Sequence, residues 1–382
     1  MVMKELLLFC NGGIMQTLIE NVNIINPNKE LLTNQSVLIE DKKIVEISND
    51  KISTKENVKI IDGEDNYLLP GFIDSHAHIM TNGFDKSDYM YNPLALHFYS
   101  AIANGRNTID AGVTFIRDCG QADLGVKMAQ QKGLFIAPKM HISITSLECT
   151  GGHFDLYLPS GVDVGLQYPG VPIGRCDGIE GVTKKTREVK RAGADFIKVM
   201  ASGGVLTENT TPEQAQFNKK ELKAIAKEAK LANLKISAHC HSLRGMNNCI
   251  KAGFSSIEHG TFINYEIAKR MIEKSIYLVP TLNVHKELLK AGFPENDVYA
   301  KEKIAKLKNI VKIHQENISD AYHIGVKMLM GSDCGVIEHG SNLKELEYLV
   351  DIGMDENEAI ASGTIEAANY LRLEDKIGSS GK

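Results

Sequence analysis

The sequence predicts an α/β protein built on a (β/α)8 TIM barrel, with a small β domain in front of it. From about residue 70 onward, short apolar β-type runs alternate with helical stretches, which is the pattern of parallel βαβ units. We count eight such runs, the number that closes a parallel barrel. Histidines and an aspartate fall near the ends of several runs, and the carboxyl ends of barrel strands carry the active sites of this architecture.

Composition narrows the class of protein. The 382 residues are 43% apolar and 24% charged, which is ordinary for a globular chain. The net charge of −5 argues against nucleic acid or an anionic membrane as the main partner. Seven cysteines without a Cys-x-x-Cys pair fit a reducing compartment, so we expect a cytoplasmic protein. The apolar run at residues 6–10 is too short to span a bilayer, and residues 1–15 are predicted as an extension or an extra strand.

The order of elements divides the chain. Short strands at residues 18–25, 36–40 and 44–47 are separated by turn signals, so residues 1–65 are predicted as a small β domain with an N-terminal extension. Residues 66–373 are predicted to hold the barrel.

Eight apolar runs supply the predicted barrel strands. They cover residues 72–78, 114–120, 139–144, 196–202, 235–241, 256–260, 276–282 and 327–333. Asn218 and Glu221 form a capping-box pattern that predicts a helix start between two of them. Apolar residues spaced three or four apart predict a further helix over residues 304–321, with His314 packed on its apolar face. The glycine- and proline-rich stretch 151–178 is the longest predicted loop.

The most informative motif is the pair His76 and His78. It follows residues 67–73, which are predicted as a buried strand. In an extended chain alternate side chains share a face, so both imidazoles point the same way and form half a metal site. An isolated pair of this kind is more often two polar loop residues. The presence of further candidate ligands in the sequence makes a metal site the preferred interpretation of this pair.

Five more candidates lie near the carboxyl ends of other predicted strands: Lys198, His239, His241, His259 and Asp333. Imidazoles with a carboxylate suit zinc and similar ions, so the set predicts two divalent metal ions.

Lys198 and Asp333 have chemical roles in this prediction. Burying the charged amine of Lys198 is costly, and the neutral amine can react with carbon dioxide to give a carbamate, an anionic bridging ligand. The alternative is a lysine paired with an acid inside the barrel. Asp333 is predicted as a general base beside metal-bound water, where the alternative is a helix N-cap.

Several motifs together resemble the amidohydrolase superfamily, over about residues 18–373. They lie at residues 70–78, 197–204, 238–241, 258–260 and 331–333. Within the superfamily the chain resembles the imidazolonepropionase-related branch that includes prolidase-like Xaa-Pro dipeptidases. Residues 200–205, 216–217 and 277–282 support that placement.

The resemblance implies a binuclear zinc site. One ion would be held by His76, His78 and Asp333, and the other by His239 and His259. Carboxylated Lys198 would bridge the two.

The resemblance also implies the chemistry of the site. A metal-bridging hydroxide would attack the substrate carbonyl, and Asp333 would carry the proton to the leaving nitrogen. His153, in a Gly-Gly-His run, is implied as a catalytic and substrate-binding residue, and His241 as a second substrate contact. Deamination is disfavoured, because Ser242, Leu243 and Arg244 follow His241 where the deaminases of the superfamily carry a glutamate.

We therefore expect a metal-dependent hydrolase of amide C–N bonds that acts on small molecules or dipeptides. The expected type is a prolidase-like dipeptidase. One alternative is a cyclic amide hydrolase acting on a hydantoin, dihydropyrimidine or lactam ring. Another is a non-catalytic interaction protein on the same barrel. Relatives complete a small β-sandwich with strands beyond residue 378, so residues 374–382 are predicted as a truncated return to an incomplete sandwich. A homo-oligomer is compatible with the resemblance.

Overall fold

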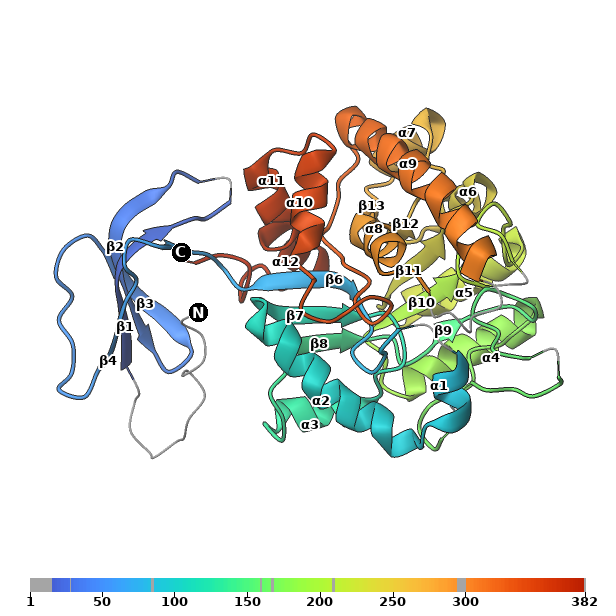
Figure 1. The fold of residues 1–382 in the computed structure, drawn as a ribbon, viewed down its shortest axis with the longest axis horizontal. Coiled ribbons are helices and arrows are strands. Elements are labelled where there is room, and N and C mark those ends of the chain that lie inside the picture. Colours follow the sequence, from blue (N-terminus) through green and yellow to red (C-terminus); the bar gives the residue numbers. More distant parts are fainter. Residues whose placement is uncertain are drawn as a thin grey trace. The chain divides into compact units, whose positions relative to one another are not determined.

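The computed structural model describes residues 16–27, 29–83, 86–158, 160–165, 168–207, 210–293 and 300–380. The prediction for residues 1–15 lies outside these ranges. The chain divides into two compact units, one formed by Met1–Phe72 with Glu356–Lys382 and the other by Ile73–Asp355 (Figure 1).

The first unit contains one five-stranded sheet. Its strands are β1 (Gln16–Ile24), β2 (Leu32–Glu40), β3 (Lys43–Ser48), β4 (Lys59–Asp62) and β5 (Tyr67–Leu68). Their order is β3-β2-β1-β4, with β5 also paired to β1. Two small apolar clusters, one around Leu18 and Leu38 and one around Ile24 and Val37, stabilise this sheet. The unit also includes helices α11 (Glu356–Ser362) and α12 (Ile365–Leu371). The first three strands were predicted from the sequence and β4 was not, while β5 lies within the predicted strand 67–73.

The second unit holds the parallel strands that position the site. They are β6 (Phe72–Ala77), β7 (Val113–Asp118), β8 (Lys139–Ile142), β9 (Ser146–Leu147), β10 (Phe196–Met200), β11 (Lys235–Cys240), β12 (Ser256–His259) and β13 (Tyr277–Val279). One sheet joins β6, β7 and β8, and another joins β9 to β13 in sequence order. The third predicted strand, residues 139–144, corresponds to β8, and β9 follows directly after it. The left-handed residue Ile144 (φ 66°) separates the two strands.

The eighth predicted strand, residues 327–333, is present as bridges and hydrogen bonds rather than as a regular strand. Leu329 N donates to Leu278 O at 2.9 Å, which joins the segment to β13. Ser75 N donates to Met330 O at 2.9 Å, which joins it to β6 and closes the ring of strands. The predicted strand 67–73 is also interrupted, since β5 ends at Leu68 and β6 begins at Phe72. Pro70, which lies between them, has no N–H to donate to a ladder.

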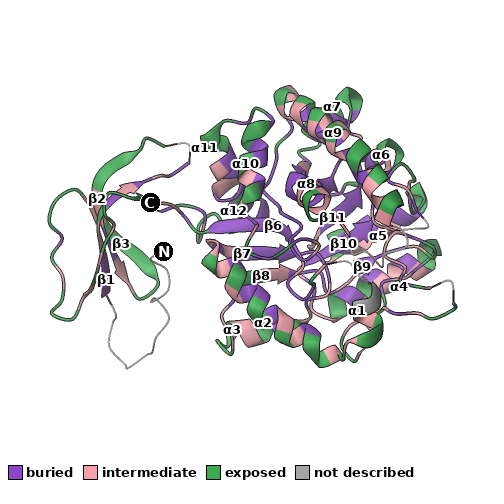
Figure 2. Ribbon diagram, viewed as in Figure 1, coloured by how far each residue is buried: buried purple, intermediate pink, exposed green. Residues whose placement is uncertain are grey.

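Helices accompany these strands. They are α1 (Lys86–Tyr91), α2 (Leu94–Asp110), α3 (Leu124–Gln131), α4 (Gly178–Arg191), α5 (Lys219–Leu231), α6 (Leu243–Ala252), α7 (Tyr265–Glu273), α8 (Leu282–Ala291), α9 (Ala300–Ile324) and α10 (Lys344–Asp351). Figure 2 shows the strands of this unit buried and the outer faces of its helices exposed. The capping box predicted at Asn218 and Glu221 opens α5. Among the described residues, no helix has the length and apolar character needed to cross a membrane.

Candidate metal centre and active site

The carboxyl ends of the strands in the second unit surround a cavity of about 70 Å³. Its walls include all of the predicted site residues: His76, His78, His153, Lys198, His239, His241, His259 and Asp333. The structure therefore brings together side chains that are as much as 257 positions apart in the sequence, from His76 to Asp333.

The first group of candidate ligands consists of His76, His78 and Asp333. One oxygen of Asp333, Oδ1, lies 3.5 Å from Nε2 of His76 and 3.3 Å from Nε2 of His78. The potential ligand atoms of the three residues lie within 4.8 Å of one another. Two imidazoles and a carboxylate at this separation match the donor set that zinc and similar ions take.

A buried ion pair fixes the orientation of His76. Its Nδ1 lies 2.8 Å from Glu258 Oε2, and Arg117 Nη2 lies 2.6 Å from the same oxygen. Burial raises the pKa of Glu258, but the charge of Arg117 and the hydrogen bond from His76 bring that pKa well below its usual range. Because an ionised carboxylate only accepts, Nδ1 of His76 carries the proton and Nε2 keeps its lone pair for the cavity.

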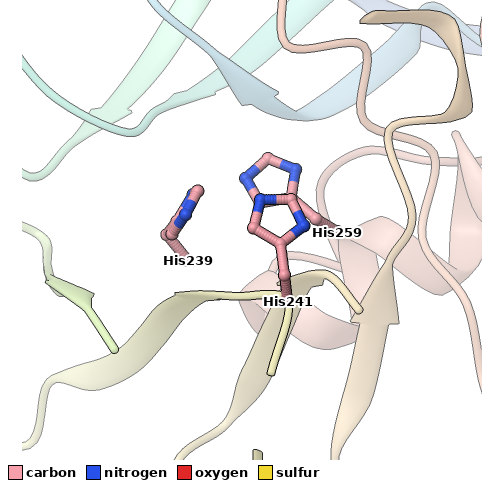
Figure 3. A group of neighbouring side chains, drawn as sticks. All are labelled: His239, His241 and His259. Carbon is pink, nitrogen blue, oxygen red and sulfur yellow. The ribbon is translucent and has the colours of Figure 1, made fainter. Parts of the chain in front are cut away.

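The second group consists of His239, His241 and His259, whose potential ligand atoms also lie within 4.8 Å of one another. Figure 3 shows the three imidazoles gathered at the ends of neighbouring strands. Nδ1 of His259 lies 2.7 Å from Thr281 Oγ1, and that hydroxyl donates to Pro280 O. The hydroxyl proton is thereby used, so Nδ1 of His259 is the donor and Nε2 is left with a lone pair. Nε2 of His239 lies 3.2 Å from Gly203 O, which leaves Nδ1 of His239 as its free nitrogen.

His241 and His153 stack against this second group. The His241 ring lies parallel to His259, with centroids 4.9 Å apart, and His153 stacks on His239 at 4.3 Å. The structure thus places His241, which the sequence analysis predicted as a substrate contact, within the range of a metal ligand as well. Gly204 makes the stacking of His153 feasible, because a methyl group at position 204 would overlap the His153 imidazole.

Lys198 lies on β10 and is 1% exposed. Its Nζ is 3.3 Å from Nε2 of His76. Within the described part of the chain, no carboxylate oxygen lies within 4.0 Å of this amine. A buried ammonium without a close carboxylate is energetically costly, and conversion to a carbamate removes that cost while adding a metal ligand. The donor set around Lys198 therefore fits two metal ions.

His285 is a further residue of the cavity wall that was not predicted from the sequence. His314 donates through Nε2 to the carbonyl oxygen of His259 at 2.9 Å, so Nδ1 of His314 accepts from His285 Nδ1, 3.1 Å away. Burial lowers the pKa of His314 to about 3 and that of His285 to about 4, so both rings are neutral. His285 lines the cavity, and Nε2, the unprotonated nitrogen of its neutral ring, is available as an acceptor. Its position shortly after the seventh predicted strand was the one signal available. His314 lies on the buried face of α9, as predicted.

The backbone is left-handed at the ends of several strands. The non-glycine residues with positive φ there are Gln121 (81°), Ile144 (66°), His259 (67°), Thr281 (52°) and Asp333 (59°). Two of these, His259 and Asp333, are predicted metal ligands. At Asp333 the backbone N–H donates to the carbonyl oxygen of His76 at 2.7 Å, which ties this left-handed residue to the end of β6.

Apolar side chains form a large part of the remaining cavity wall: Phe154, Met200, Val205, Leu206, Val284, Leu288 and Val336. Such a wall excludes water and strengthens electrostatic interactions inside the cavity.

The fold and the clustered imidazoles define an α/β-barrel enzyme with its site at the carboxyl ends of the strands. The amidohydrolase family model matches residues 67–380, so the chain belongs to the amidohydrolase family and is a hydrolase acting on C–N bonds. This confirms the predicted superfamily and the class of enzyme, and it argues against a non-catalytic interaction protein.

Similar proteins refine the comparison. The ochratoxinase of Aspergillus niger is 32% identical over 355 residues, which cover 88% of this chain and 73% of that protein. The crystal structure of a Xaa-Pro dipeptidase with bound methionine is 31% identical with a TM-score of 0.85, covering 95% of this chain and 90% of that one. A prolidase complexed with N-methylphosphonate-L-proline is 28% identical, also with a TM-score of 0.85, covering 96% and 90%. These similarities confirm the barrel-type α/β fold and the likeness to prolidase-like enzymes. Placement in the imidazolonepropionase-related branch stays a prediction.

Proposed function

We propose that the protein is a binuclear metal-dependent hydrolase of amide bonds, acting on dipeptides in the manner of prolidase-like enzymes. One observation carries this proposal. Two groups of candidate ligands converge on one cavity, with the buried amine of Lys198 beside them and, among the described residues, no carboxylate oxygen within 4.0 Å of that amine.

In this proposal His76, His78 and Asp333 would hold one ion, and His239 and His259 would hold the other. Lys198, once carboxylated, would contribute a ligand shared by the two ions. When bound, two zinc-class ions polarise the substrate carbonyl and supply an activated water as nucleophile.

Asp333 moves the proton. Burial raises its pKa, but the neighbouring His76 and His78 lower that pKa well below the usual range, so the carboxylate is ionised and can accept a proton. From the same position Asp333 can pass that proton to the departing nitrogen. His153 and His241 lie on the cavity wall and orient the substrate, while the apolar wall keeps bulk water out.

The names of the similar proteins support the substrate class, since they include a Xaa-Pro dipeptidase, a prolidase and an ochratoxinase. We also propose a cytoplasmic location. The cysteines that the structure describes are all free, which is typical of a reducing compartment.

Elemental analysis of protein purified without chelators tests the metal assignment. We expect about two zinc-class ions per chain in the wild type and about one or fewer in Lys198→Ala. Lys190→Ala, which removes an exposed lysine of α4, is the matched control and should leave the metal content unchanged. One ion per chain, unaffected by Lys198→Ala, would contradict the bridged site.

A substrate screen on the same preparations tests the reaction. We expect the wild type to hydrolyse Xaa-Pro and other small dipeptides, and Lys198→Ala to lose this activity. Hydrolysis of hydantoin or dihydrouracil without any dipeptide hydrolysis would overturn the dipeptidase proposal in favour of a cyclic amide hydrolase.

A further inference from the structure

A second cavity, of about 50 Å³, adjoins the catalytic one at the end of the third barrel strand. Gln121 and Phe154 line both cavities. The strand itself leads from one to the other, because Ser146 lines the catalytic cavity and Glu148, two residues further on, lines the second.

The second cavity contains a buried carboxyl group, that of Glu148, with one oxygen that makes no hydrogen bond. Glu148 is 6% exposed, and its Oε2 makes no hydrogen bond. Most buried polar atoms in folded proteins are hydrogen-bonded, and an unsatisfied carboxylate oxygen is costly to bury. A group that is supplied from outside the chain would remove this cost.

The nearby charges show what sign that group must have. Among the described residues, Arg175 is the one guanidinium on the wall of this cavity, and it is already engaged by Asp155 (Nη1 to Oδ1, 2.9 Å) and by Asp163. Each of these aspartates also accepts from a backbone N–H. With Glu148 ionised, three carboxylates would therefore face one guanidinium, which excludes an anionic ligand and favours a cation.

Burial and the neighbouring Asp155 raise the pKa of Glu148 well above its usual range, and Arg175 only partly offsets this. An added positive charge would act in the opposite direction and favour the ionised form of the carboxyl group.

The arrangement of the carboxylates around this cavity indicates which kind of cation it can bind. The described groups whose ligand atoms converge within 4.8 Å all lie in the barrel interior, and Glu148, Asp155 and Asp163 do not form one, so a compact metal ion is not favoured. An organic ammonium or guanidinium group, which is held by hydrogen bonds to a carboxylate rather than by several converging ligand atoms, fits this arrangement. Because Gln121 and Phe154 line both cavities, a group bound in the second one lies next to the substrate site.

We propose that the cavity around Glu148 is a subsite for an ammonium or guanidinium group of the substrate, with the Glu148 carboxylate as its partner. This inference rests on the proposed dipeptidase function. It predicts that a substrate with a positively charged group on one side of the scissile bond is preferred to a neutral substrate of the same shape.

Pairs of substrates that differ only in this charge provide the test. One pair is alanyl-lysine and alanyl-norleucine, and the other is lysyl-alanine and norleucyl-alanine. For one pair we expect kcat/KM of the wild type to favour the lysyl substrate by about tenfold or more, since a charged hydrogen bond is at stake. Glu148→Gln keeps the shape of the side chain and should bring this ratio to about one, with kcat/KM for the norleucyl substrate changed by less than about twofold.

The norleucyl activity shows whether Glu148→Gln has folded. Glu266→Gln, an exposed substitution on α7, is the matched control and should keep the wild-type ratio. A wild-type ratio near one for both pairs, or a ratio that Glu148→Gln leaves unchanged, would overturn the subsite. Replacing lysine by arginine in the preferred pair distinguishes an ammonium from a guanidinium partner.

Failure of the proposed function would look different, because no member of either pair would then be hydrolysed by the metal-loaded enzyme. In that case calorimetric titration of the full chain with cadaverine or agmatine decides on the cavity alone, with n-pentanol as the neutral control. Saturable amine binding that is lost in Glu148→Gln supports the cation subsite. No amine binding by the wild type overturns it.

Discussion

At the scale of single residues, the site is organised by what the second nitrogen of each histidine does. His76 and His259 hold their Nδ1 protons on Glu258 and Thr281, so the opposite nitrogen is fixed as the one that faces the cavity. Such partners orient the ligand and raise its basicity, and losing them typically weakens metal binding. The specificity of the centre therefore depends on residues that touch neither metal nor substrate.

Substitution of Glu258 tests this. Glu258→Gln removes the charge that compensates the buried Arg117 and replaces one of the two acceptor oxygens, which serve Arg117 and His76 among others, by an NH2 donor. We expect the free energy of unfolding of the metal-free protein to fall by about 3–5 kcal/mol, because breaking a buried pair leaves an uncompensated charge. Metal affinity should fall by about 10–100-fold. Urea unfolding and competition with a chelator measure the two effects, and unchanged metal affinity would show that Glu258 has only a structural role.

A second substitution isolates His153. Gly204→Ala places a methyl group where the His153 ring stacks on His239, so the ring must move. We expect kcat/KM to fall by about tenfold or more, since loss of positioning is costly to catalysis, while the metal content is unchanged. Gly181→Ala is the matched control, because a methyl group at that helical position meets no other atom within 4 Å. Full activity of Gly204→Ala would show that the position of the His153 ring is not important for catalysis.

At the scale of elements, the start of α8 is held by a carboxyl group from α10. Glu345 accepts from the backbone N–H groups of Leu282 (3.0 Å) and Asn283 (2.7 Å). Both groups are first-turn donors of α8 that have no partner within their own helix. The contact fixes the segment that carries Thr281, and through it His259.

The stability of this contact should depend on pH. Burial raises the pKa of Glu345 from 4.5 to about 8, so between these values the folded protein binds a proton that the unfolded chain has lost. The contribution of Glu345 to stability is therefore full below the unfolded value and is lost as the pH rises through about 8. We expect the free energy of unfolding of the wild type, relative to that of Glu345→Gln, to decrease between about pH 5 and pH 9. Parallel denaturation curves of the two proteins would contradict this.

At the scale of the whole molecule, metal binding and barrel stability should be linked. Histidines from β6, β11 and β12 project lone pairs into one small cavity, next to the amine of Lys198. A ligand that binds only the folded state raises the apparent stability, by about 4 kcal/mol at a free concentration of 1,000 times its Kd. We therefore expect chelation to lower the melting temperature measured by calorimetry and added zinc to restore it. If chelation removes the metal but leaves the melting temperature unchanged, metal binding does not contribute to the stability of the barrel.

The sequence predicted those features that depend on local pattern. His76, Lys198 and His239 sit on or beside strands whose apolar runs are easy to recognise, so their shared location followed from the barrel. The roles of Glu258 and Glu345 could not be predicted, because their partners are 182 and 63 positions away. The eighth strand was placed correctly but lacks regular pairing, since its apolar pattern says nothing about how many ladder bonds form. The unpartnered state of Glu148 is likewise a property of the three-dimensional arrangement alone.

A change to glycine at the left-handed residues of the strand ends would have different effects on stability at different positions. At such a position a side chain costs about 1 kcal/mol relative to glycine. At His259 and Asp333, however, glycine would delete a proposed metal ligand. Ile144 and Gln121 share this conformation without being ligands, so they mark where the barrel could tolerate a more relaxed backbone. Glycine at position 259 or 333 would relieve about 1 kcal/mol of strain but forfeit the larger metal-linked stability, so selection for thermal tolerance alone should already retain His259 and Asp333.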